Sequence, residues 1–393
     1  MSGISEFFKR IFSQRNNDAE YSTKKRKTRL QKFLLSFFIT LGATVVVGFI
    51  IGYFYLTRAV IVPPEIRPIQ QPIRPPQAGN SQNSNSDNND NDNDNDNDEQ
   101  FPYWYNYLVA PEGFTDADRR DNFFTFMIVG LNDGRNANTV MVASYDTVAR
   151  EANLISIPRD SLLAVNRNGR RIAASYIAGS GGGRGREGGI SALQRDVFSI
   201  IGFVPDIYVI LDYDAFFAII DAVGGIDVYV PFHMRYDDPF QNLFIDIPAG
   251  QQTLDAETAL HFARFRQSNV RGFHSPPNSD YFRIESQQAI INAVISRLLR
   301  PQNLLRIPEF VDIFNDAVHT NLNVGNMLYF ARELNHIRGT DALNSFTMPM
   351  AGTTGHPTWY EILNAREVVN LVNETINPFY RDIELRDVNI VSQ

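Results

Sequence analysis

The distribution of apolar and polar positions separates a first quarter of the chain without a globular pattern from a globular remainder that begins near residue 101. Several runs are apolar at almost every position and rich in β-branched and aromatic residues, which is typical of strands buried on both faces. These predicted strands are 123–132, 139–146, 152–158, 206–212 and 226–230. Segments with a helical spacing of apolar residues fall at 190–202, 213–223, 255–263, 280–300, 303–318, 325–336 and 360–376. Strands interleaved with helices predict an α/β fold in which helices cover a central mixed sheet.

A long uncharged apolar run, residues 33–56, predicts one transmembrane helix before this domain. Such a run corresponds to about 36 Å of helix, enough to cross a hydrocarbon layer of about 30 Å with some tilt. Basic residues crowd the segment before the run, whereas Arg58 alone follows it closely. The positive-inside rule therefore predicts a cell-membrane protein with a cytoplasmic N-terminal tail (1–32) and an extracytoplasmic remainder.

A cleaved secretory signal is the alternative interpretation of the same run. A signal would have a shorter apolar region followed by small residues at a cleavage site, and the sequence shows neither. A buried core helix is also disfavoured, because the run lies between a strongly basic flank and a proline-rich one. We therefore expect an uncleaved single-pass anchor.

Residues 57–100 have the composition of a linker between the anchor and a globular domain at 101–393. The part from 61 to 78 is rich in proline and should be extended and stiff. The part from 81 to 100 consists mainly of asparagine, serine and aspartate, which favours a solvated, disordered spacer. A calcium loop is disfavoured there, because the spaced glycine and closing glutamate of an EF-hand are missing.

Composition narrows the classes of function. The chain has 36 basic and 44 acidic residues and a formal net charge of −8, whereas a nucleic-acid-binding protein usually carries a basic excess. It contains no cysteine, which excludes disulfides, thiolate metal sites and a cysteine nucleophile. Every lysine lies at or before Lys32, so a phosphate group bound by the globular domain has to be held by arginine, whose planar guanidinium suits bidentate contacts.

Two common kinds of catalytic site find no support in the sequence. The six histidines are scattered without an HxxxH pair, and no serine elbow of the G-x-S-x-G type occurs, which disfavours a zinc enzyme and a Ser-His-Asp hydrolase. The glycine-rich stretch 179–189 lacks the Lys-Ser/Thr pair of a phosphate loop. We expect it to be a mobile loop, or alternatively a flap that presents Arg184 and Arg186 to an anion.

The helix expected from residue 280 carries a polar line at its start. Asp280, Arg283 and Gln287 are spaced so that they project from one side of a helix. The other side carries an apolar stripe that consists of Ile284, Ile291, Ala293, Val294, Ile295 and Leu298. An acid, an arginine and an amide at a helix N-terminus suit an anion-binding site. The alternative is that Asp280 only caps the helix and that Arg283 is solvated.

Two further groups of charged residues are candidates for the same site. Arg159 and Asp160 directly follow a predicted strand, at the edge where α/β proteins usually build their sites. Arg264 and Arg266 are two residues apart, so on an extended segment their side chains would point the same way. Each group alone is compatible with an ordinary surface position. The stronger signal is the order of the groups along the chain.

Taken in order, these residues resemble the motifs of the LytR-CpsA-Psr family of cell-envelope proteins. The combination consists of SIPRD at 156–160, DAVGG at 221–225, R-x-R at 264–266 and D-x-x-R-x-x-x-Q at 280–287, preceded by IVGLN at 128–132 and NTVMV at 138–142. The resemblance covers residues 121–300 closely and a C-terminal loop at 348–355 more loosely. A short cytoplasmic tail, one membrane helix and an external domain also suit this family.

The resemblance implies an α/β/α sandwich with a central mixed sheet and an apolar tunnel that accepts a polyprenyl chain. It implies a glycopolymer transferase, a phosphotransferase that moves a glycopolymer from polyprenyl pyrophosphate to a hydroxyl of peptidoglycan, or sometimes of a protein. Arginines at the tunnel mouth would stabilise negative charge on the pyrophosphate. The implied binding residues are Arg159, Arg171, Arg264, Arg266, Arg283 and Gln287. Asp280 would take the hydroxyl proton, and Arg159 and Arg283 would complete the catalytic group.

The sequence departs from the family where aspartates usually help to hold magnesium. Asn132 and Asn138 stand at those positions, and Asp133 adjoins the first of them. An amide oxygen binds a hard cation more weakly than a carboxylate does, so we expect any Mg²⁺ at these three residues to be held less tightly. Ser286 also replaces a second arginine, and the segment 267–279 is longer than usual, which is expected to reshape the acceptor groove.

Functions of different classes stay open at this point. The first is the membrane-anchored glycopolymer transferase, whose partners would be lipid-linked glycan and peptidoglycan, with no nucleic acid. The second is an envelope protein that binds polyprenyl pyrophosphate or acts as a regulator without catalysis. Hydrolysis of polyprenyl pyrophosphate by a phosphatase is a further alternative. A transcriptional role is disfavoured, because no DNA-binding element accompanies the acidic domain.

Overall fold

The computed structural model describes residues 63–66, 68–69, 109–132, 136–181, 184–304, 306–334, 343–355 and 358–391. The chain divides into two compact units, Met1–Ile61 and Val62–Gln393, and all described residues belong to the second. The predicted tail (1–32), the predicted membrane helix (33–56) and most of the predicted linker (57–100) lie outside the described residues. No helix in the described ranges has both the length and the apolar character that a bilayer-crossing segment needs.

A short described piece of the proline-rich stretch contacts the globular domain. The backbone amide of Ile69 donates a hydrogen bond of 2.7 Å to the carboxylate of Asp116. The Ile69 side chain packs against the main hydrophobic core. This part of the stretch therefore lies on the surface of the domain.

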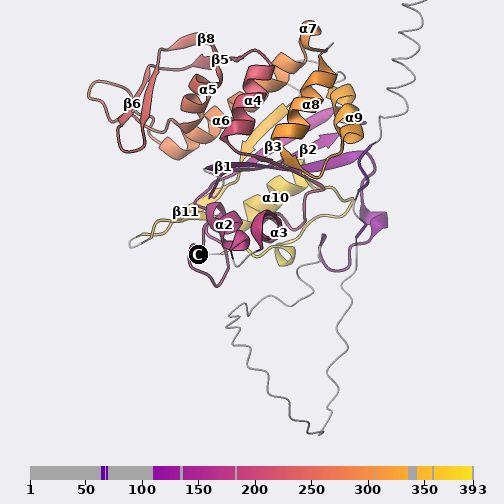
Figure 1. The fold of residues 1–393 in the computed structure, drawn as a ribbon. Coiled ribbons are helices and arrows are strands. Elements are labelled where there is room, and N and C mark those ends of the chain that lie inside the picture. The colour runs from indigo at the N-terminus through magenta and orange to yellow at the C-terminus, as the bar shows by residue number, and fades with distance from the viewer. Residues whose placement is uncertain are drawn as a thin grey trace, which may run out of the picture. The chain divides into compact units, whose positions relative to one another are not determined.

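The domain is built on a six-stranded sheet in the order β10-β3-β2-β1-β4-β9 (Figure 1). Its strands are β1 (Phe123–Asn132), β2 (Asn136–Asp146), β3 (Glu151–Ile157), β4 (Ile207–Leu211), β9 (His319–Thr320) and β10 (Leu343–Thr347). β1 runs antiparallel to β2 and parallel to β4, and β3 runs antiparallel to β2 and parallel to β10. The mixed sheet predicted from the sequence is thereby confirmed.

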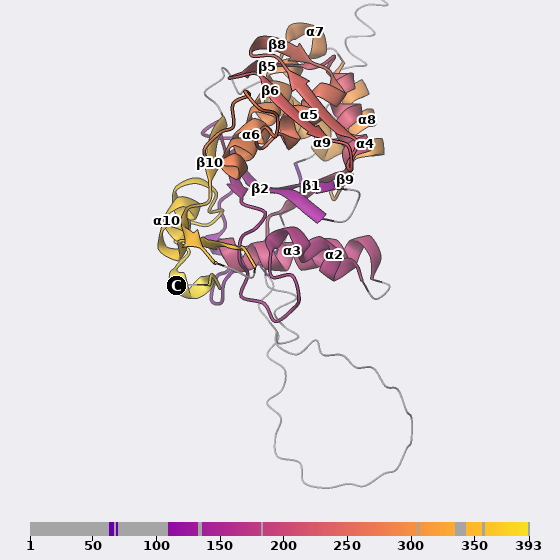
Figure 2. The ribbon, with the colours of Figure 1, turned by 90° about the vertical axis from the view of Figure 1, so that its left-hand side faces the viewer.

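Helices cover both faces of this sheet (Figures 1 and 2). One face carries α2 (Ser175–Ser180), α3 (Gly185–Ile201) and α10 (Ala365–Thr375). The opposite face carries α4 (Tyr213–Ala222), α5 (Ala256–Arg264), α6 (Ser279–Leu298), α8 (Ile307–Ala317) and α9 (Val324–Leu334), with the short α7 (Pro301–Leu304) between α6 and α8. Each predicted helix has a counterpart among these elements.

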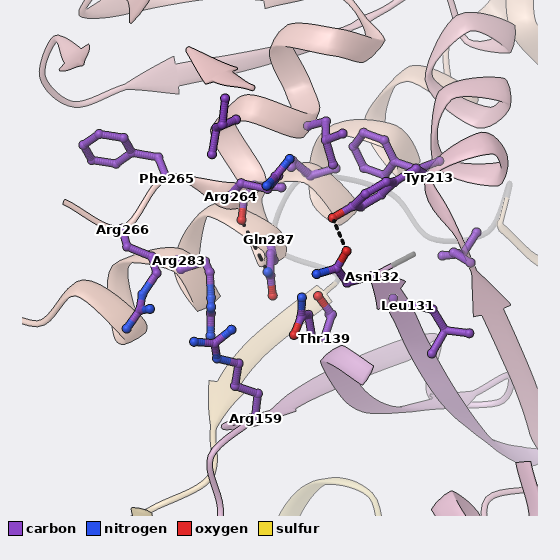
Figure 3. Close-up of a pocket in the computed structure, with 18 of the residues that line it drawn as sticks. Leu131, Asn132, Thr139, Arg159, Tyr213, Arg264, Phe265, Arg266, Arg283 and Gln287 are labelled. Atoms are coloured by element: carbon purple, nitrogen blue, oxygen red, sulfur yellow. Dashed lines mark hydrogen bonds between the residues drawn. The ribbon is translucent and has the colours of Figure 1, made fainter. Parts of the chain in front are cut away.

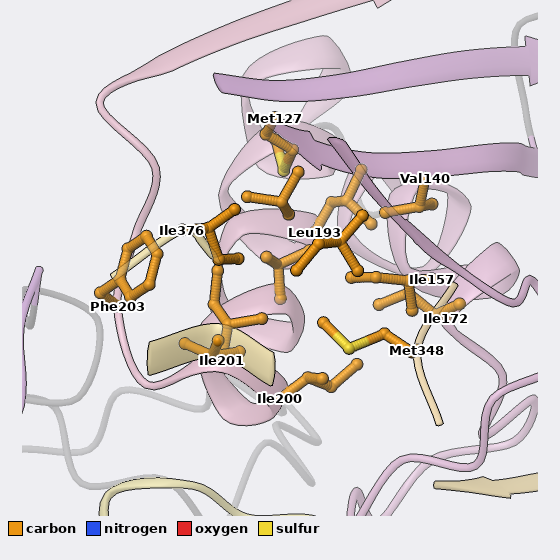
Figure 4. Close-up of a cluster of buried hydrophobic side chains, with 14 of the residues drawn as sticks. Met127, Val140, Ile157, Ile172, Leu193, Ile200, Ile201, Phe203, Met348 and Ile376 are labelled. Atoms are coloured by element: carbon orange, nitrogen blue, oxygen red, sulfur yellow. The ribbon is translucent and has the colours of Figure 1, made fainter. Parts of the chain in front are cut away.

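The main core lies between the sheet and the α3 and α10 side. Met127 of β1, Leu193 of α3 and Val372 of α10 are fully buried in it, and Figure 4 shows the side chains of the strands meeting those of the helices. On the other face of β1, the ring of Phe126 lies 5.0 Å from the ring of Phe330 in α9. β1 is therefore buried on both faces, as its unbroken apolar run predicts.

A second core cluster lies under two small antiparallel sheets on the α5 and α6 side. One pairs β5 (Ile226–Val230) with β8 (Gly250–Leu254), and the other pairs β6 (Met234–Asp238) with β7 (Leu243–Ile247). In β7 the apolar Leu243 and Ile245 are buried, whereas Phe244 and Asp246 between and beyond them are exposed. Only β5 was predicted. β6 and β8 were missed because they have few apolar residues, and β7 was missed although its residues are mostly apolar.

The glycine-rich stretch 179–189 is largely helical, so the expectation of a mobile loop or flap is wrong for its described residues. A Cβ atom on Gly179 would lie 2.3 Å from that of Ala192, and one on Gly188 would lie 2.4 Å from the carbonyl oxygen of Gly179. The glycines therefore let α2 and α3 pack backbone against backbone. Neither Arg184 nor Arg186 lines the cavity of the candidate site.

The start of the last predicted helix is instead a strand, β12 (Glu361–Leu363), which pairs with β11 (Met350–Thr353). The amide of Leu162 donates to the carbonyl of Glu361 (2.8 Å), so β12 is also tied to the turn after β3. Helix α10 begins only after Asn364, whose side chain accepts a hydrogen bond from the amide of Glu367. This pairing with distant segments overrides the helical spacing of residues 360–364.

Candidate active site

A cavity of about 470 Å³ lies between the sheet and the helices α4, α5 and α6, with the β6–β7 hairpin along one side (Figure 3). Its size is within the range of pockets that hold small ligands. The apolar part of its wall consists of Ile128, Leu131, Met141, Leu211, Phe216, Leu243, Ile245, Leu260, Phe265, Ile290 and Ile291. The polar part includes Asn132, Asn138, Thr139, Arg159, Tyr213, Arg264, Arg266, Arg283 and Gln287. The cavity thus combines a greasy wall with a cluster of permanent cations.

Arg159 reaches the cavity from the turn that follows β3. The Ser161 hydroxyl donates to the carbonyl of Pro158 (2.7 Å), and the amide of Ala173 donates to the carbonyl of Arg159 (3.0 Å). These bonds fix the turn at the end of a central strand. Arg159 Nε lies 3.5 Å from Asp160 Oδ2. The position predicted for these two residues, at the end of a strand, is confirmed.

The N-terminus of α6 supplies the second part of the cluster. Asn278 caps this helix by accepting a hydrogen bond from the amide of Tyr281, so the alternative that Asp280 is merely the cap is wrong. The Asp280 carboxylate instead binds two arginines. Arg266 donates to its Oδ2 (2.7 Å), and Arg283 forms a 2.9 Å ion pair with its Oδ1.

Arg283 is a buried cation, with only 6% of its surface exposed. The alternative of a solvated Arg283 is therefore wrong. Burial, and next the neighbouring guanidinium of Arg159, lowers the pKa of Arg283 to about 10. A group with that pKa is still charged at neutral pH. Figure 3 shows the ends of Arg159 and Arg283 side by side, with Arg266 next to them. Like charges gathered in a buried place favour an anionic ligand.

Hydrogen-bonding capacity is left over in this cluster. The Nε–H groups of Arg159, Arg266 and Arg283 are buried and have no hydrogen-bond acceptor within the described part of the chain. Buried donors without a partner are rare in folded proteins and call for an explanation. Pyrophosphate oxygens are acceptors of the charge and geometry that guanidinium groups bind well.

Arg171 contacts the arginine cluster through Asp160. Its Nε lies 3.3 Å from Asp160 Oδ1, its NH2 group donates to the carbonyl of Trp359 (3.0 Å), and its guanidinium lies 5.5 Å from the centre of the Tyr360 ring. Arg171 does not line the cavity. Each of two aspartates thus holds two arginines. Asp160 contacts Arg159 and Arg171, and Asp280 contacts Arg266 and Arg283.

Arg264 and Arg266 both line the cavity but do not act as a pair, because Arg264 ends a helix and the extended segment on which they would point the same way begins only after it. Arg264 is the last residue of α5, and its guanidinium lies 5.9 Å from the centre of the Tyr213 ring. Arg266 instead turns to Asp280. Gln287 also lines the cavity and donates to the carbonyl of Ala263 (3.4 Å), which joins α6 to α5.

Asn132 and Asn138 line the same cavity as the arginines. The Tyr213 hydroxyl donates to Asn132 Oδ1 (3.1 Å), so that oxygen already has a partner. Asp133, the third predicted metal ligand, lies outside the described residues. The described ranges contain no group of three or more histidine, cysteine or acidic residues that could hold a metal ion. The two predicted ligands that the structure describes, Asn132 and Asn138, are neutral amides, which bind Mg²⁺ more weakly than carboxylates do. Asp212, a carboxylate, also lines this cavity.

Glu361 is a site residue that the sequence reading missed. It lies in β12 and is 6% exposed. Burial, and next the nearby carboxylates of Asp280 and Asp160, raises the pKa of Glu361 to about 7, against the opposing effect of Arg283 and Arg159. A lone glutamate between Tyr360 and Ile362 gives no motif, so only the pairing of β12 with the turn after β3 reveals it.

A family model described as the LytR_cpsA_psr family matches residues 78–377, well over half of the chain. Among curated proteins, the polyisoprenyl-teichoic acid--peptidoglycan teichoic acid transferase TagV of Bacillus subtilis (strain 168) is 29% identical over 220 residues, which are 53% of this chain and 52% of that protein. The regulatory protein MsrR of Staphylococcus aureus (strain COL) is 21% identical over 242 residues, or 60% of this chain and 68% of that protein. The chain therefore spans about half the length of the first relative.

Solved structures show a similar fold. The crystal structure of Bacillus subtilis TagV has a TM-score of 0.53 at 23% identity and covers 65% of this chain and 96% of that one. The crystal structure of protein gbs0355 from Streptococcus agalactiae has a TM-score of 0.53 at 17% identity, with 64% and 86% covered. At these identities the similarity concerns the α/β fold with its central mixed sheet.

Proposed function

Because the chain belongs to the LytR_cpsA_psr family, we propose that it is a phosphotransferase that moves a glycopolymer from polyprenyl pyrophosphate to a hydroxyl of peptidoglycan. The observation that carries this proposal is the arginine cluster at a cavity with an apolar wall. Three guanidinium groups with unused buried N–H donors lie where a greasy tail and a diphosphate would have to meet. The name of the TagV relative, a teichoic acid transferase, supports the same reaction class.

The apolar wall would hold the polyprenyl chain. It is built from β1, α4, α5, α6 and the β6–β7 hairpin, and its side chains are aliphatic or aromatic. Transfer of apolar surface out of water stabilises such a complex by about 25 cal/mol for each Å² buried. The pyrophosphate would then lie against Arg159, Arg266 and Arg283, with Arg264 and Gln287 farther along the wall, while Arg171 would act through Asp160.

In the chemical step, the acceptor hydroxyl oxygen attacks the phosphorus that carries the glycopolymer. The bond from this phosphorus to the bridging oxygen breaks, and polyprenyl phosphate leaves with the electron pair. Charge that develops on the phosphate oxygens is stabilised by the guanidinium groups, which need no rearrangement because the aspartates already hold them. The product is a phosphodiester between the glycopolymer and the acceptor.

The hydroxyl proton would pass to Asp280. Its Oδ1 is buried, forms an ion pair with Arg283 and makes no hydrogen bond within the described part of the chain, so it keeps the capacity to accept a proton. Asp280 lies behind the residues that line the cavity and is not one of them. Asp280 also stands at the N-terminus of α6, between the arginines that would hold the reacting phosphate. A positioned base of this kind contributes roughly 10²–10⁴-fold to the rate.

We propose that any Mg²⁺ at Asn132, Asn138 and Asp133 is held weakly, and the steps above are not routed through it. Asn132 and Asn138 offer amide oxygens, and the first is already bonded to Tyr213. The family's charge-neutralising role for a metal would fall here to the arginines, which carry permanent charge. We further propose that the protein is anchored in the cell membrane by residues 33–56, with its N-terminus in the cytoplasm and the domain outside.

A second function is favoured by the same two asparagines. If carboxylates at 132 and 138 are needed for turnover, the chain would bind polyprenyl pyrophosphate as a regulatory or carrier protein without catalysis. The name of the Staphylococcus aureus relative, a regulatory protein, fits that class.

A transfer assay with the full chain in detergent separates these functions. The protein is mixed with lipid-linked glycan and peptidoglycan, with and without divalent cations. Binding of the lipid-linked glycan, released polyprenyl phosphate and glycan attached to peptidoglycan are all measured. We expect both products in equal amounts. Release without attachment would identify a phosphatase, binding without release a non-catalytic protein, and absence of binding would overturn the site. An Arg306→Ala variant, altered at an exposed ion pair on α8, is the control for charge removal.

A further inference from the structure

Glu361 is held beneath the arginine cluster by backbone bonds. Its amide donates to the carbonyl of Asp160 (3.0 Å), and its carbonyl accepts from the amide of Leu162 (2.8 Å). Ser161 and Glu361 form a parallel bridge between these two segments. Glu361 therefore cannot move away from the turn that carries Arg159 without breaking that pairing.

Charged and titratable groups from two other segments face the Glu361 carboxyl. The turn after β3 contributes Arg159 and Asp160, and α6 contributes Asp280 and Arg283, all of which act on it electrostatically. Tyr281 of α6 lies near enough that Glu361 acts on its pKa. On its own segment, Tyr360 stacks with Arg171. The carboxyl itself makes no side-chain hydrogen bond with the described residues, and it does not line the cavity.

The charges of this cluster nearly balance. The cluster contains the four arginines Arg159, Arg171, Arg266 and Arg283. Asp160 and Asp280 form ion pairs with them, whereas Glu361 interacts with Arg159 and Arg283 only electrostatically. The two aspartates are each fixed by ion pairs, so Glu361 is the member whose charge can change at least cost. With Glu361 ionised the cluster carries one net positive charge, and with Glu361 protonated it carries two.

We propose that Glu361 is a positioning residue that takes up a proton when pyrophosphate binds to the neighbouring Arg159 and Arg283, which Asp160 and Asp280 hold in place. In the empty site the ionised carboxylate attracts these two guanidinium groups. When the diphosphate arrives, it brings negative charge next to Glu361, which disfavours the ionised carboxylate. The inference rests on the proposed function, because it concerns the same pyrophosphate site.

A measurable uptake of protons at neutral pH requires a carboxyl that is partly ionised in the empty protein. The pKa of Glu361, raised to about 7 by burial and next by Asp280, meets that condition. A glutamate with an ordinary pKa would stay ionised unless the ligand shifted it by several units. Linkage then predicts that pyrophosphate affinity falls as the pH rises above 7, by at most about tenfold per pH unit.

Isothermal titration calorimetry of the full chain in detergent tests this inference, with geranyl pyrophosphate as the probe. Titrations at pH 7 in two non-phosphate buffers of different ionisation enthalpy give the number of protons taken up. We expect the wild type to take up a fraction of a proton more than Glu361→Gln at pH 7 and at pH 8, with a ceiling of about half a proton at pH 7. Protonation of the probe itself is common to both proteins and cancels in the difference.

Two further variants complete the experiment. Glu361→Asp keeps a carboxyl at the position and should restore part of the uptake, whereas the loss of a structural contact alone would not follow the carboxyl. Glu374→Gln, at an exposed position of α10, should behave as the wild type. Should Glu361→Gln fail to fold, the uptake by wild type and by Glu361→Asp still decides the matter.

The possible failures are distinguishable. Equal proton uptake by wild type and Glu361→Gln, or tight binding by the wild type with no uptake at pH 7 and 8, overturns the role of Glu361 and leaves the pyrophosphate site standing. If the wild-type chain binds neither geranyl pyrophosphate nor the lipid-linked glycan, the proposed function fails, and this inference fails with it.

Discussion

Asp280 and Arg283 form a 2.9 Å ion pair across one turn at the start of α6, and Arg266 binds the other oxygen of the same carboxylate. The pair therefore joins α6 to the segment that follows α5. Because Arg283 is buried, its positive charge needs a compensating negative charge. Asp280 supplies it in the empty protein, and a bound anion would supply more of it in the complex.

Replacing either of two arginines should weaken ligand binding without loss of the fold. We expect Arg159→Ala and Arg283→Ala each to reduce the affinity for polyprenyl pyrophosphate by about 1.5–3 kcal/mol, the usual contribution of a charge-assisted hydrogen bond. Asp280 keeps Arg266 as a partner in the second variant. Titration calorimetry of both variants, with Arg306→Ala as the matched control, measures the change. Unchanged affinity in both would count against the assigned site.

Replacing the proposed base should separate binding from turnover. Asp280→Asn keeps the size and an oxygen acceptor for Arg266 but cannot take a proton as readily. We expect transfer to slow by roughly 10²–10⁴-fold while the affinity for the lipid changes little. Single-turnover transfer and lipid binding are measured on the same preparation, with Asp316→Asn on the exposed side of α8 as the control. Undiminished turnover would show that Asp280 is not the base.

Glu361 should make the stability of the domain depend on pH. The pKa of Glu361 is raised from 4.5 to about 7 in the folded chain. Its contribution to the stability of the fold is therefore complete below about pH 4.5 and is lost as the pH rises through 7. Glu361→Gln removes the free-energy cost of ionising this buried carboxyl at high pH. We expect it to raise the free energy of unfolding by roughly 2–4 kcal/mol at pH 8 and by about 1 kcal/mol or less at pH 5.

Denaturant unfolding at the two pH values measures that difference, and Glu374→Gln is the control. A gain at pH 8 that is no larger than the gain at pH 5 would mean that Glu361 is ionised at both.

Restoring carboxylates should create a response to magnesium. We expect the double variant Asn132→Asp, Asn138→Asp to gain a rise in melting temperature on addition of MgCl₂, of about 2–4 °C for each kcal/mol of binding. The wild type should respond less, because amide oxygens bind Mg²⁺ weakly. Thermal unfolding of both proteins with and without MgCl₂, with NaCl at matched ionic strength as the control, gives the answer. An equally large response in the wild type would contradict the expectation.

The close packing of α2 and α3 should make one glycine sensitive to a single methyl group. A Cβ on Gly179 meets both Ala192 and the carbonyl of Gly188 at 2.3 Å, so we expect Gly179→Ala to destabilise the domain by about 1–3 kcal/mol. Gly181→Ala is the matched control, since its nearest neighbour, the carbonyl of Ala178, lies 3.9 Å away. Denaturant unfolding of the two variants compares them. Equal stability would mean that the helices separate without cost.

Much of the fold could be read from local patterns. The run at 123–132 became β1 with the predicted limits, and the helices near 213, 256 and 280 begin within a residue or two of their expected positions. These segments are long and apolar, so burial decides their conformation. The predictions failed where the decisive contact is distant in the chain. Residues 361–363 form a strand because they pair with the turn after β3, and the glycines at 179 and 188 are helical because two helices meet there.

The sequence by itself determined that any phosphate bound by the domain must be held by arginine, because no lysine follows Lys32. Its motifs also named Arg159, Asp280 and Arg283 as candidates. Only the tertiary structure decided that these residues share one place, that Arg264 and Arg266 diverge, and that Glu361 lies among them. The physical reason is that charge and periodicity are properties of a segment, whereas burial, ion pairing and a shifted pKa depend on which distant segments the sheet brings together.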